Sequence, residues 1–354
     1  MATVQVSKLK LGDRIISDVF TQKGNVLFQK GKTITPREIE ILKAFFIQSV
    51  SIESKQLQEE SQVPENTEKH EVKPETAGFE KEYESMLQLL KKSFNMANGG
   101  SLPILEIRSK MQSLLNHINE YNILIFTPPK FVITDYIYHN SIMVALTSYN
   151  LSRWHGISQK DWIQAALAGL LHDIGNIKID PNILNKPSKL TPQEFEEIKK
   201  HTILGYNVLK NVAGINEGVK LAALQHHEKE DGSGYPLGVK GDKVHFYAKI
   251  VAIADVFHAM TNRRFYKQAS SPYLVLEQIF NESFGKLDPS LVQTFINKIT
   301  QFHSGTLVRL SNNLIGKIVF TDRAHPTRPW VDVNGKIINL ATDRNLYIEQ
   351  IVQQ

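Results

Sequence analysis

The segment IQAALAGLLHD, residues 163–173, decides how the rest of the chain is interpreted. Its apolar residues recur at the spacing of one helix face, at Ile163, Ala166, Leu167, Leu170 and Leu171. The segment then ends on an imidazole and a carboxylate, His172 and Asp173. Adjacent helix positions differ by about 100° in direction, so this helix end can reach two metal ions or two faces of one ion. The pattern predicts an apolar core helix that presents metal-competent side chains at its end.

Helical patterns extend from residue 79 to residue 303. A second apolar stripe comprises Ile104, Ile107, Met111, Leu114, Leu115 and Ile118. Thr191-Pro192-Gln193-Glu194 is a capping box that predicts a helix running through His201, and Asp288-Pro289 opens another helix. The sequence has no βαβ alternation and no glycine-rich phosphate loop, which argues against a dinucleotide-binding fold and a P-loop. We therefore predict a mainly α fold, with 79–303 as one helical domain.

The first 78 residues differ from this helical region. In 1–53, short apolar runs are separated by Gly24 and Gly31, and Thr35 caps a helix start, which is typical of a small α+β module. We expect this module to regulate the protein or to serve as a docking site, through contact with a second copy of the chain or with a signalling protein. Residues 54–78 carry six Glu and almost no large apolar side chain, and they predict an acidic linker.

The last 51 residues return to strand-like apolar runs. These runs are 308–310, 315–320, 330–333, 337–340 and 347–351. Asn334-Gly335 lies between two of them and is a tight hairpin-turn signal. Residues 304–354 are therefore predicted to be a small β-rich C-terminal appendage.

The composition excludes several classes of site. The 354 residues include 12 His and no Cys, so disulfides, thiolate zinc sites, cysteine-ligated clusters and cysteine nucleophiles are ruled out. The net charge of +5 is spread along the chain without a basic block, which argues against a duplex nucleic acid partner. Neither a signal peptide nor an apolar run of about 18–20 residues occurs, so we expect a cytoplasmic protein with no membrane contact.

Further imidazoles and one buried carboxylate accompany His172-Asp173. Asp255 lies in the otherwise apolar segment 250–257, where a carboxylate is costly unless it is paired or bound to a cation. His226 and His227 end another apolar stretch. Imidazole and carboxylate without sulfur suit iron, manganese, zinc or nickel. Two close ions bridged by a carboxylate and a hydroxide would cleave phosphodiesters, because they lower the pKa of water to about 7 and stabilise both reacting oxygens.

Three motifs resemble one known family. His172-Asp173-Ile174-Gly175 resembles the HD signature of metal-dependent phosphohydrolases. The segment HHEKEDGSGYP, residues 226–236, resembles the signature of the HD-GYP subfamily. The stretch 254–257, followed by 264–267, is similar to the next motif of that subfamily. HD alone is a weak signal, but the combination at this separation is specific, and the resemblance covers about 135–300.

The resemblance implies an HD-type helical bundle with two or three divalent ions, often iron or manganese, and hydrolysis of cyclic di-GMP or a related cyclic dinucleotide to pGpG or GMP. The implied metal ligands are His172, Asp173, His201, His226, His227 and Asp255, with Asp173 as the bridging, catalytic carboxylate. His139 matches a further ligand position. Asp135 precedes it by one helical turn and would hold a third ion; the alternative is a solvated carboxylate at a helix N-terminus.

Substrate-binding groups follow from the same resemblance. Arg264 and Lys267 match basic residues of the substrate pocket, where a guanidinium grips a phosphate or a guanine edge and an ammonium supplies charge. The alternative is that they are exposed cations at a helix end. Tyr235 would stack on or hydrogen-bond to the ligand, or it would simply pack the glycine-rich loop onto the helices.

Asn176 departs from the family pattern, which usually has lysine at this position. Asn donates a hydrogen bond but carries no charge and no transferable proton. Loss of a charged contact in a dry site costs roughly 10²-fold or more in rate. Asn176 therefore keeps open a second reading, a catalytically weak receptor for a cyclic dinucleotide that signals to a protein partner. A third reading is a hydrolase of ordinary nucleotides, against which the DGSGYP loop argues.

Overall fold

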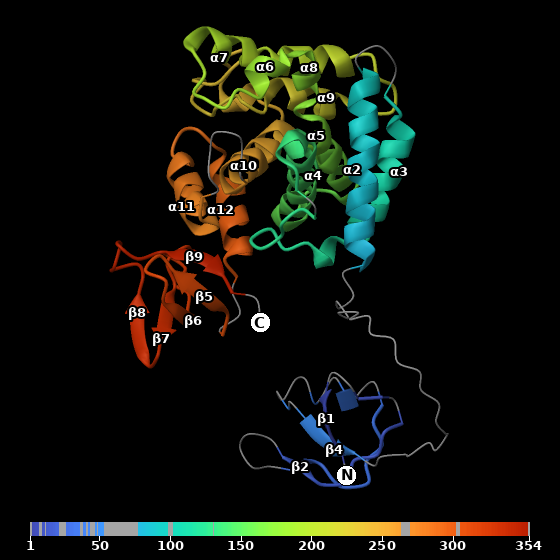
Figure 1. The fold of residues 1–354 in the computed structure, drawn as a ribbon, viewed down its shortest axis with the longest axis vertical. Helices are drawn as coiled ribbons and strands as arrows, with labels where there is room; N and C mark the ends of the chain where they lie inside the picture. The colour runs from blue at the N-terminus through green and yellow to red at the C-terminus, as the bar shows by residue number, and fades with distance from the viewer. Residues whose placement is uncertain are drawn as a thin grey trace, which may run out of the picture. The chain divides into compact units, whose positions relative to one another are not determined.

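The computed structural model describes residues 2–6, 9–10, 12–20, 26–35, 38–39, 42, 47, 49–52, 77–97, 102–129, 131–262, 270–301 and 305–352. The chain divides into two compact units, 1–71 and 72–354, which are considered separately (Figure 1). The predicted linker 54–78 lies almost entirely outside the described residues, and the domain boundaries deduced from the sequence stay predictions.

The N-terminal unit contains two small antiparallel strand pairs. Strand β1 (Ala2–Gln5) pairs with β4 (Ser49–Ile52), and β2 (Val19–Phe20) pairs with β3 (Val26–Phe28). Glu38 reaches back to the predicted cap residue, because the Thr35 backbone N–H donates to the Glu38 carboxylate at 3.1 Å.

One apolar core joins most helices of the second unit. The helices are α2 (Ala77–Ala97), α3 (Ile104–Leu115), α4 (Tyr136–His155), α5 (Gln159–Leu171), α6 (Pro181–Leu184), α7 (Pro192–Lys199), α8 (His201–Leu209), α9 (Glu217–Gln225), α10 (Phe246–Thr261), α11 (Pro272–Glu282) and α12 (Pro289–Ile299). Short 3₁₀ turns are η2 (Ile118–Glu120), η3 (Ile133–Asp135), η4 (Ile174–Lys178) and η5 (Gly241–Lys243). The short helices α6 and α7 contribute no buried residue to the core. The middle of α4 is buried on all sides, as expected for a helix in the centre of a bundle. None of the described helices is both long and apolar enough to cross a membrane.

The predicted helix from Thr191 through His201 is wrong in one respect. The capping box forms, but α7 ends at Lys199 and a separate helix, α8, begins at His201. The His201 ring donates to the Ile198 carbonyl, and the Thr202 hydroxyl donates to the Lys199 carbonyl. These side chains satisfy the last carbonyls of α7, so the chain can change direction at this point. The break places His201 at the first position of α8.

A five-stranded antiparallel sheet follows the helices, in the order β8-β7-β6-β5-β9. The strands are β5 (Leu307–Leu310), β6 (Ile315–Phe320), β7 (Trp330–Val333), β8 (Lys336–Asn339) and β9 (Ile348–Ile351). Asn334 and Gly335, with φ of 54° and 84°, form the tight turn between β7 and β8. The mainly α fold with a small C-terminal sheet is thus confirmed.

Gly175 lets η4 lie directly against α8. A Cβ at this position would lie 1.9 Å from the His201 carbonyl oxygen and 2.5 Å from the Gly205 backbone nitrogen. Both neighbours are backbone atoms, which cannot rotate away as a side chain can. The close approach brings the turn after Asp173 to the helix that carries His201.

Gly175→Ala is therefore expected to destabilise the helical unit by about 3 kcal/mol, because even one methyl group forces η4 and α8 apart. Thermal unfolding should show a Tm lower by about 6 °C or more. Gln193→Ala, an exposed change on α7, is the control and should leave the Tm nearly unchanged. An unaltered Tm for Gly175→Ala would show that this contact is not as rigid as its geometry implies.

Candidate metal centre

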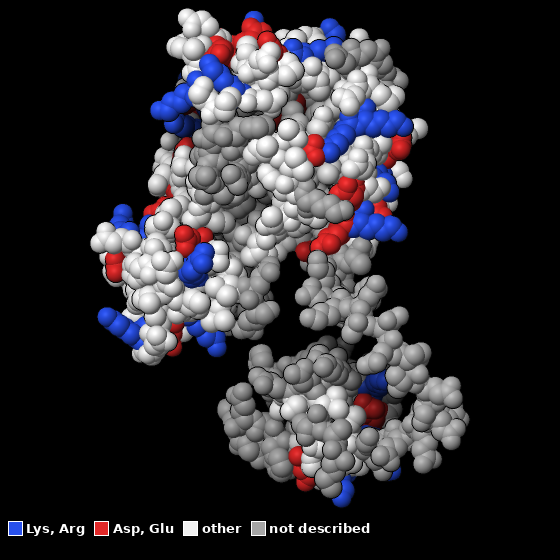
Figure 2. All heavy atoms as spheres, viewed as in Figure 1, with Lys and Arg blue, Asp and Glu red and all other residues white. Residues whose placement is uncertain are grey.

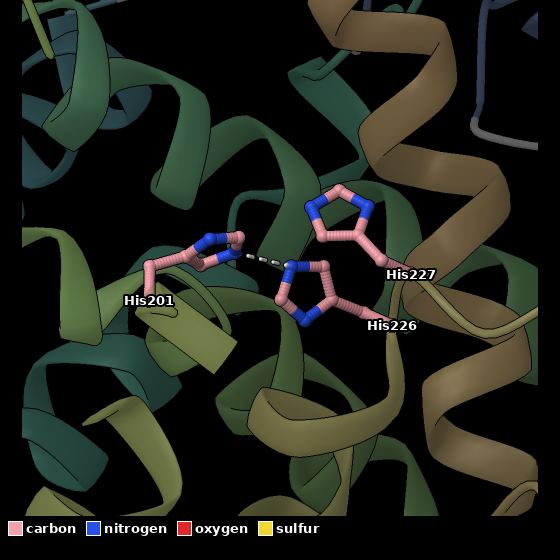
Figure 3. Close-up of side chains that lie close together, drawn as sticks. All are labelled: His201, His226 and His227. Atoms are coloured by element: carbon pink, nitrogen blue, oxygen red, sulfur yellow. Dashed lines mark hydrogen bonds between the residues drawn. The ribbon is translucent and has the colours of Figure 1, made fainter. Parts of the chain in front are cut away.

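Four segments deliver the imidazoles and carboxylates to one place. His172 directly follows α5, and Asp173 precedes η4. His201 begins α8, while His226 and His227 follow α9. Asp255 projects from α10. Figure 3 shows the ring of His201, at the start of α8, facing the rings of the consecutive residues His226 and His227, which follow α9.

Asp173 lies among three of the imidazoles. Its Oδ1 is 3.3 Å from His201 Nε2 and 3.8 Å from His226 Nε2, and its Oδ2 is 3.4 Å from His172 Nε2. Ligand atoms about 2.1 Å from one ion and at right angles to each other lie about 3.0 Å apart. The two Asp173 oxygens face different imidazoles, which is the geometry that the predicted bridging role requires.

The backbone fixes which ring nitrogen faces the centre. The Nδ1 atoms of His172 and His201 lie 2.7 Å from the carbonyls of Gly169 and Ile198, and His226 Nδ1 lies 3.0 Å from the Ala222 carbonyl. A carbonyl only accepts, so each Nδ1 carries the proton and donates it. Each Nε2 therefore faces the interior, where it offers a lone pair to a metal ion once it carries no proton, as metal-binding imidazoles do.

The donor atoms fall into two overlapping groups. His201, His226 and His227 form one group, and His172, Asp173 and His226 form the other; within each group the ligand atoms lie within 4.8 Å of one another. His172 Nε2 is buried and makes no hydrogen bond within the described residues, but carboxylate oxygens of Asp173 and Asp255 lie 3.4 and 3.5 Å from it. A cation that takes the place of the ring proton would bind these buried groups together. These residues fit a pair of divalent ions held by nitrogen and oxygen.

The charges of the groups differ. Burial alone would lower the pKa of His172, but the Asp173 and Asp255 carboxylates outweigh it and raise the pKa to about 9. Burial and the neighbouring imidazoles hold the pKa of His226 well below its usual range and lower the pKa of His227 to about 3. The part of the centre near Asp173 and Asp255 therefore favours a positive charge. The rings of His226 and His227 are neutral at pH 7, and each keeps a lone pair.

Asp255 is held by a residue that the sequence did not single out. Its Oδ1 accepts a hydrogen bond of 3.0 Å from the Asn140 amide and lies 3.5 Å from His172 Nε2. Asn140 is buried on α4, and its own oxygen lies 3.3 Å from the Tyr136 hydroxyl. The expected cost of burying the Asp255 carboxylate is therefore offset by an amide and an imidazole.

His139 and Asp135 lie outside both donor groups in the described part of the chain. His139 is buried on α4, with Nδ1 3.0 Å from the Tyr83 hydroxyl and Nε2 without a partner among the described residues. Asp135 ends η3, and its Oδ2 lies 2.6 Å from Lys91 Nζ. Both contacts come from α2, which the sequence had not connected with the site.

The DGSGYP loop closes over this cluster. The Tyr235 ring stacks on His227 with centroids 4.7 Å apart, and its backbone N–H donates to the His227 carbonyl. Gly232 has a φ of 81°, and a Cβ on Gly234 would lie 2.4 Å from the Glu228 Cα. The two glycines thus provide the positive φ and the close approach that the sequence predicts.

Glu228 holds the far side of the loop. Its buried carboxylate accepts from the Leu237 backbone N–H at 2.6 Å and from the Val239 backbone N–H at 3.2 Å. Because hydrogen bonds to a charged group contribute about 1.5–3 kcal/mol each, this carboxylate fixes the loop that carries Tyr235.

Glu228→Gln is expected to raise KM for a cyclic dinucleotide about tenfold, since the amide can accept one of the two hydrogen bonds but turns a donor toward the other N–H. The metal content should stay that of the wild type. Steady-state kinetics with metal counting check this, and Glu217→Gln on the surface of α9 is the matched control. A lower metal content with unchanged KM would contradict a role confined to the loop.

The remaining predicted residues divide into two cases. Asn176 is buried in η4, three positions after Asp173. Arg264 and Lys267 lie outside the described residues. Sequence reasoning missed Asn140, Tyr83 and Lys91, because they belong to no motif and are connected to the site only through tertiary contacts. The adjacency of Asn140 to His139 on a buried helix was the one available signal.

Charged residues show no single-sign concentration on the face in Figure 2, where Lys and Arg are interspersed with Asp and Glu over the helical part. A duplex-binding surface requires clustered cations. No such cluster is seen among the described residues on this face.

Comparison with known proteins shows what the chain is similar to. A family model described as HD domain matches residues 122–291. A cyclic di-GMP phosphodiesterase of Pseudomonas aeruginosa is 32% identical over 185 residues, which cover 52% of this chain and 44% of that protein. One from Thermotoga maritima is 42% identical over 147 residues, covering 40% of this chain and 39% of the relative. The chain thus spans less than half the length of these two relatives.

A solved structure shows the same fold. An HDG"Y"P protein from Bdellovibrio bacteriovorus superposes with a TM-score of 0.51 at 16% identity, covering 85% of this chain and 99% of that one. The helical fold, the family match over 122–291 and the signature at 226–236 agree. The chain therefore carries an HD domain over residues 122–291, and its similarity to these relatives is consistent with the HD-GYP family of the HD superfamily.

Proposed function

We propose that this chain is a metal-dependent phosphodiesterase that hydrolyses cyclic di-GMP in second-messenger signalling. The observation that carries the proposal is the convergence of six donor residues from separate segments beside the loop of Tyr235: His172, Asp173, His201, His226, His227 and Asp255. The names of its relatives favour cyclic di-GMP as the substrate. The donor set suits iron or manganese, and zinc and nickel are also compatible.

When bound, two divalent ions supply a water of lowered pKa and positive charge for the attacking and leaving oxygens. The protein's part is to hold the donors, orient the phosphodiester and exclude water. Burial and the carboxylates of Asp173 and Asp255 raise the pKa of Tyr235, so its hydroxyl stays protonated and can donate to a phosphate oxygen. We assign Arg264 and Lys267 to the other phosphate or to a guanine edge. Asn176 would donate a neutral hydrogen bond near the metals.

Protein purified without oxygen tests the proposal. We expect about two ions per chain and the release of pGpG or GMP from cyclic di-GMP. Cyclic GMP-AMP, cyclic di-AMP and ordinary nucleotides complete the substrate panel. Activity on nucleotides alone, with none on cyclic dinucleotides, would replace the proposal with the third reading of the sequence.

Asn176 favours one alternative function, a weakly catalytic receptor. In that case the chain binds a cyclic dinucleotide at micromolar or tighter affinity without forming product, and residues 1–53 pass the signal to a partner. Binding and turnover measured on the same preparation separate the two. A cytoplasmic location and a role of 1–53 in forming a homodimer or binding a signalling protein belong to both versions.

A further inference from the structure

Helix α2 occupies the two residues that would hold a third metal ion. Lys91 Nζ lies 2.6 Å from Asp135 Oδ2, and the side chains are only 27% and 22% exposed. Asp135 lies one helical turn before His139 at the start of α4. At this distance and degree of burial the ammonium neutralises the carboxylate.

His139 is held by the same helix but keeps one nitrogen available. The Tyr83 hydroxyl lies 3.0 Å from His139 Nδ1, and the two rings stack with centroids 5.9 Å apart at 13°. His139 Nε2 is completely buried and has no partner among the described residues. In the tautomer whose Nδ1 donates to the Tyr83 hydroxyl, His139 Nε2 carries a lone pair, as in a metal-binding imidazole. What this ligand lacks is a free carboxylate beside it.

We propose that Lys91 and a third divalent ion are alternative partners of Asp135, so that the docked α2 restricts the centre to two ions. The proposal rests on the metal centre of the proposed function. With Lys91 in place, the pair has no net charge, and a divalent ion would meet an ammonium within a few ångströms. When Lys91 withdraws, the Asp135 carboxylate and His139 Nε2 become an oxygen and a nitrogen donor on adjacent turns, a set suited to iron or manganese.

The position of α2 in the chain gives the exchange a regulatory meaning. Figure 1 shows α2 beside α4, and it is the first helix after the predicted linker 54–78. Any event that loosens α2 frees Asp135, whereas the six donors of the two-ion centre lie on other segments. The number of bound ions can therefore change while the two-ion centre stays intact.

Metal counting on the full chain tests the exchange. Wild type, Lys91→Met and Lys91→Arg are purified without oxygen, equilibrated with excess Mn²⁺, freed of unbound ion and analysed for ions per chain. We expect about two ions in wild type and Lys91→Arg, and about three in Lys91→Met, which keeps the aliphatic stem but loses the charge. The double variant Lys91→Met/Asp135→Asn should return to about two. Mn²⁺ electron paramagnetic resonance provides an independent signature of the added ion.

Several results would overturn the exchange: three ions in wild type, two ions in Lys91→Met, or three ions in the double variant. Lys91→Gln replaces Lys91→Met if that variant unfolds. Failure of the proposed function looks different, because wild type would then bind no ions or would bind two without any hydrolysis. The metal count therefore judges the exchange separately from turnover.

Discussion

Asp173→Ala is expected to lower kcat for cyclic di-GMP by on the order of 10⁴-fold, roughly 5 kcal/mol of transition-state stabilisation. The reason is geometric. Asp173 Oδ1 lies 3.3 Å from His201 Nε2 and Oδ2 lies 3.4 Å from His172 Nε2, so one substitution removes the carboxylate of the group His172, Asp173 and His226 and also the oxygen that faces His201 of the other group. The four imidazoles cannot compensate for this loss. His226 and His227 supply no negative charge, so the positive charge of the bound ions would stay uncompensated in a buried site.

The ion count should fall in parallel, from about two per chain to one or none. Anaerobic metal analysis and product analysis on the same sample check both effects. Asp242→Ala, an exposed carboxylate in η5, is the control and should leave both quantities unchanged. A variant that keeps two ions but loses turnover would show that Asp173 acts on the substrate without bridging the metals.

Asn176→Lys is expected to raise kcat about 10²-fold, because it restores a charged donor near the reacting phosphate in a site that excludes water. Asn176 is buried in η4, three residues after Asp173, and the proposed function assigns its side chain a place near the metals. Steady-state kinetics with cyclic di-GMP provide the measurement, and thermal unfolding shows whether the longer side chain is accommodated.

Asn176→Met is the matched control, since it has a similar length but no charge, and it should not raise kcat. If the wild type binds cyclic di-GMP without product while Asn176→Lys turns it over, the wild type is a receptor. If the wild type already turns over and Asn176→Lys leaves kcat unchanged, the missing charge is supplied elsewhere in the site.

Much of the site was predictable because its ligands lie in local patterns. His172 and Asp173 end an apolar helix, and Asp255 interrupts another, so the sequence marks each as a polar group in a buried place. The loop glycines were predictable for a similar reason, since Gly232 requires a positive φ and Gly234 has no room for a side chain. Local sequence carries such information because it reflects local sterics and burial.

The supporting contacts were not predictable from the sequence. Asn140 holds Asp255 across a separation of 115 residues, and Lys91 holds Asp135 across 44. Neither pair has a recognisable spacing, because the distance between them is set by how α2, α4 and α10 pack. The break before His201 was missed for a related reason, since side-chain hydrogen bonds to the last carbonyls of α7 override the helical periodicity.

The sequence by itself determined the class of fold, the identity of the metal-competent residues and the absence of sulfur among them. These follow from apolar periodicity, from turn chemistry and from composition, which are properties of residues near one another in the chain. The tertiary structure alone decided that Asp173 lies among three imidazoles and that Asp135 is paired with Lys91. Such choices depend on the packing of distant helices against a common core, where burial makes each charge take the nearest partner of opposite sign.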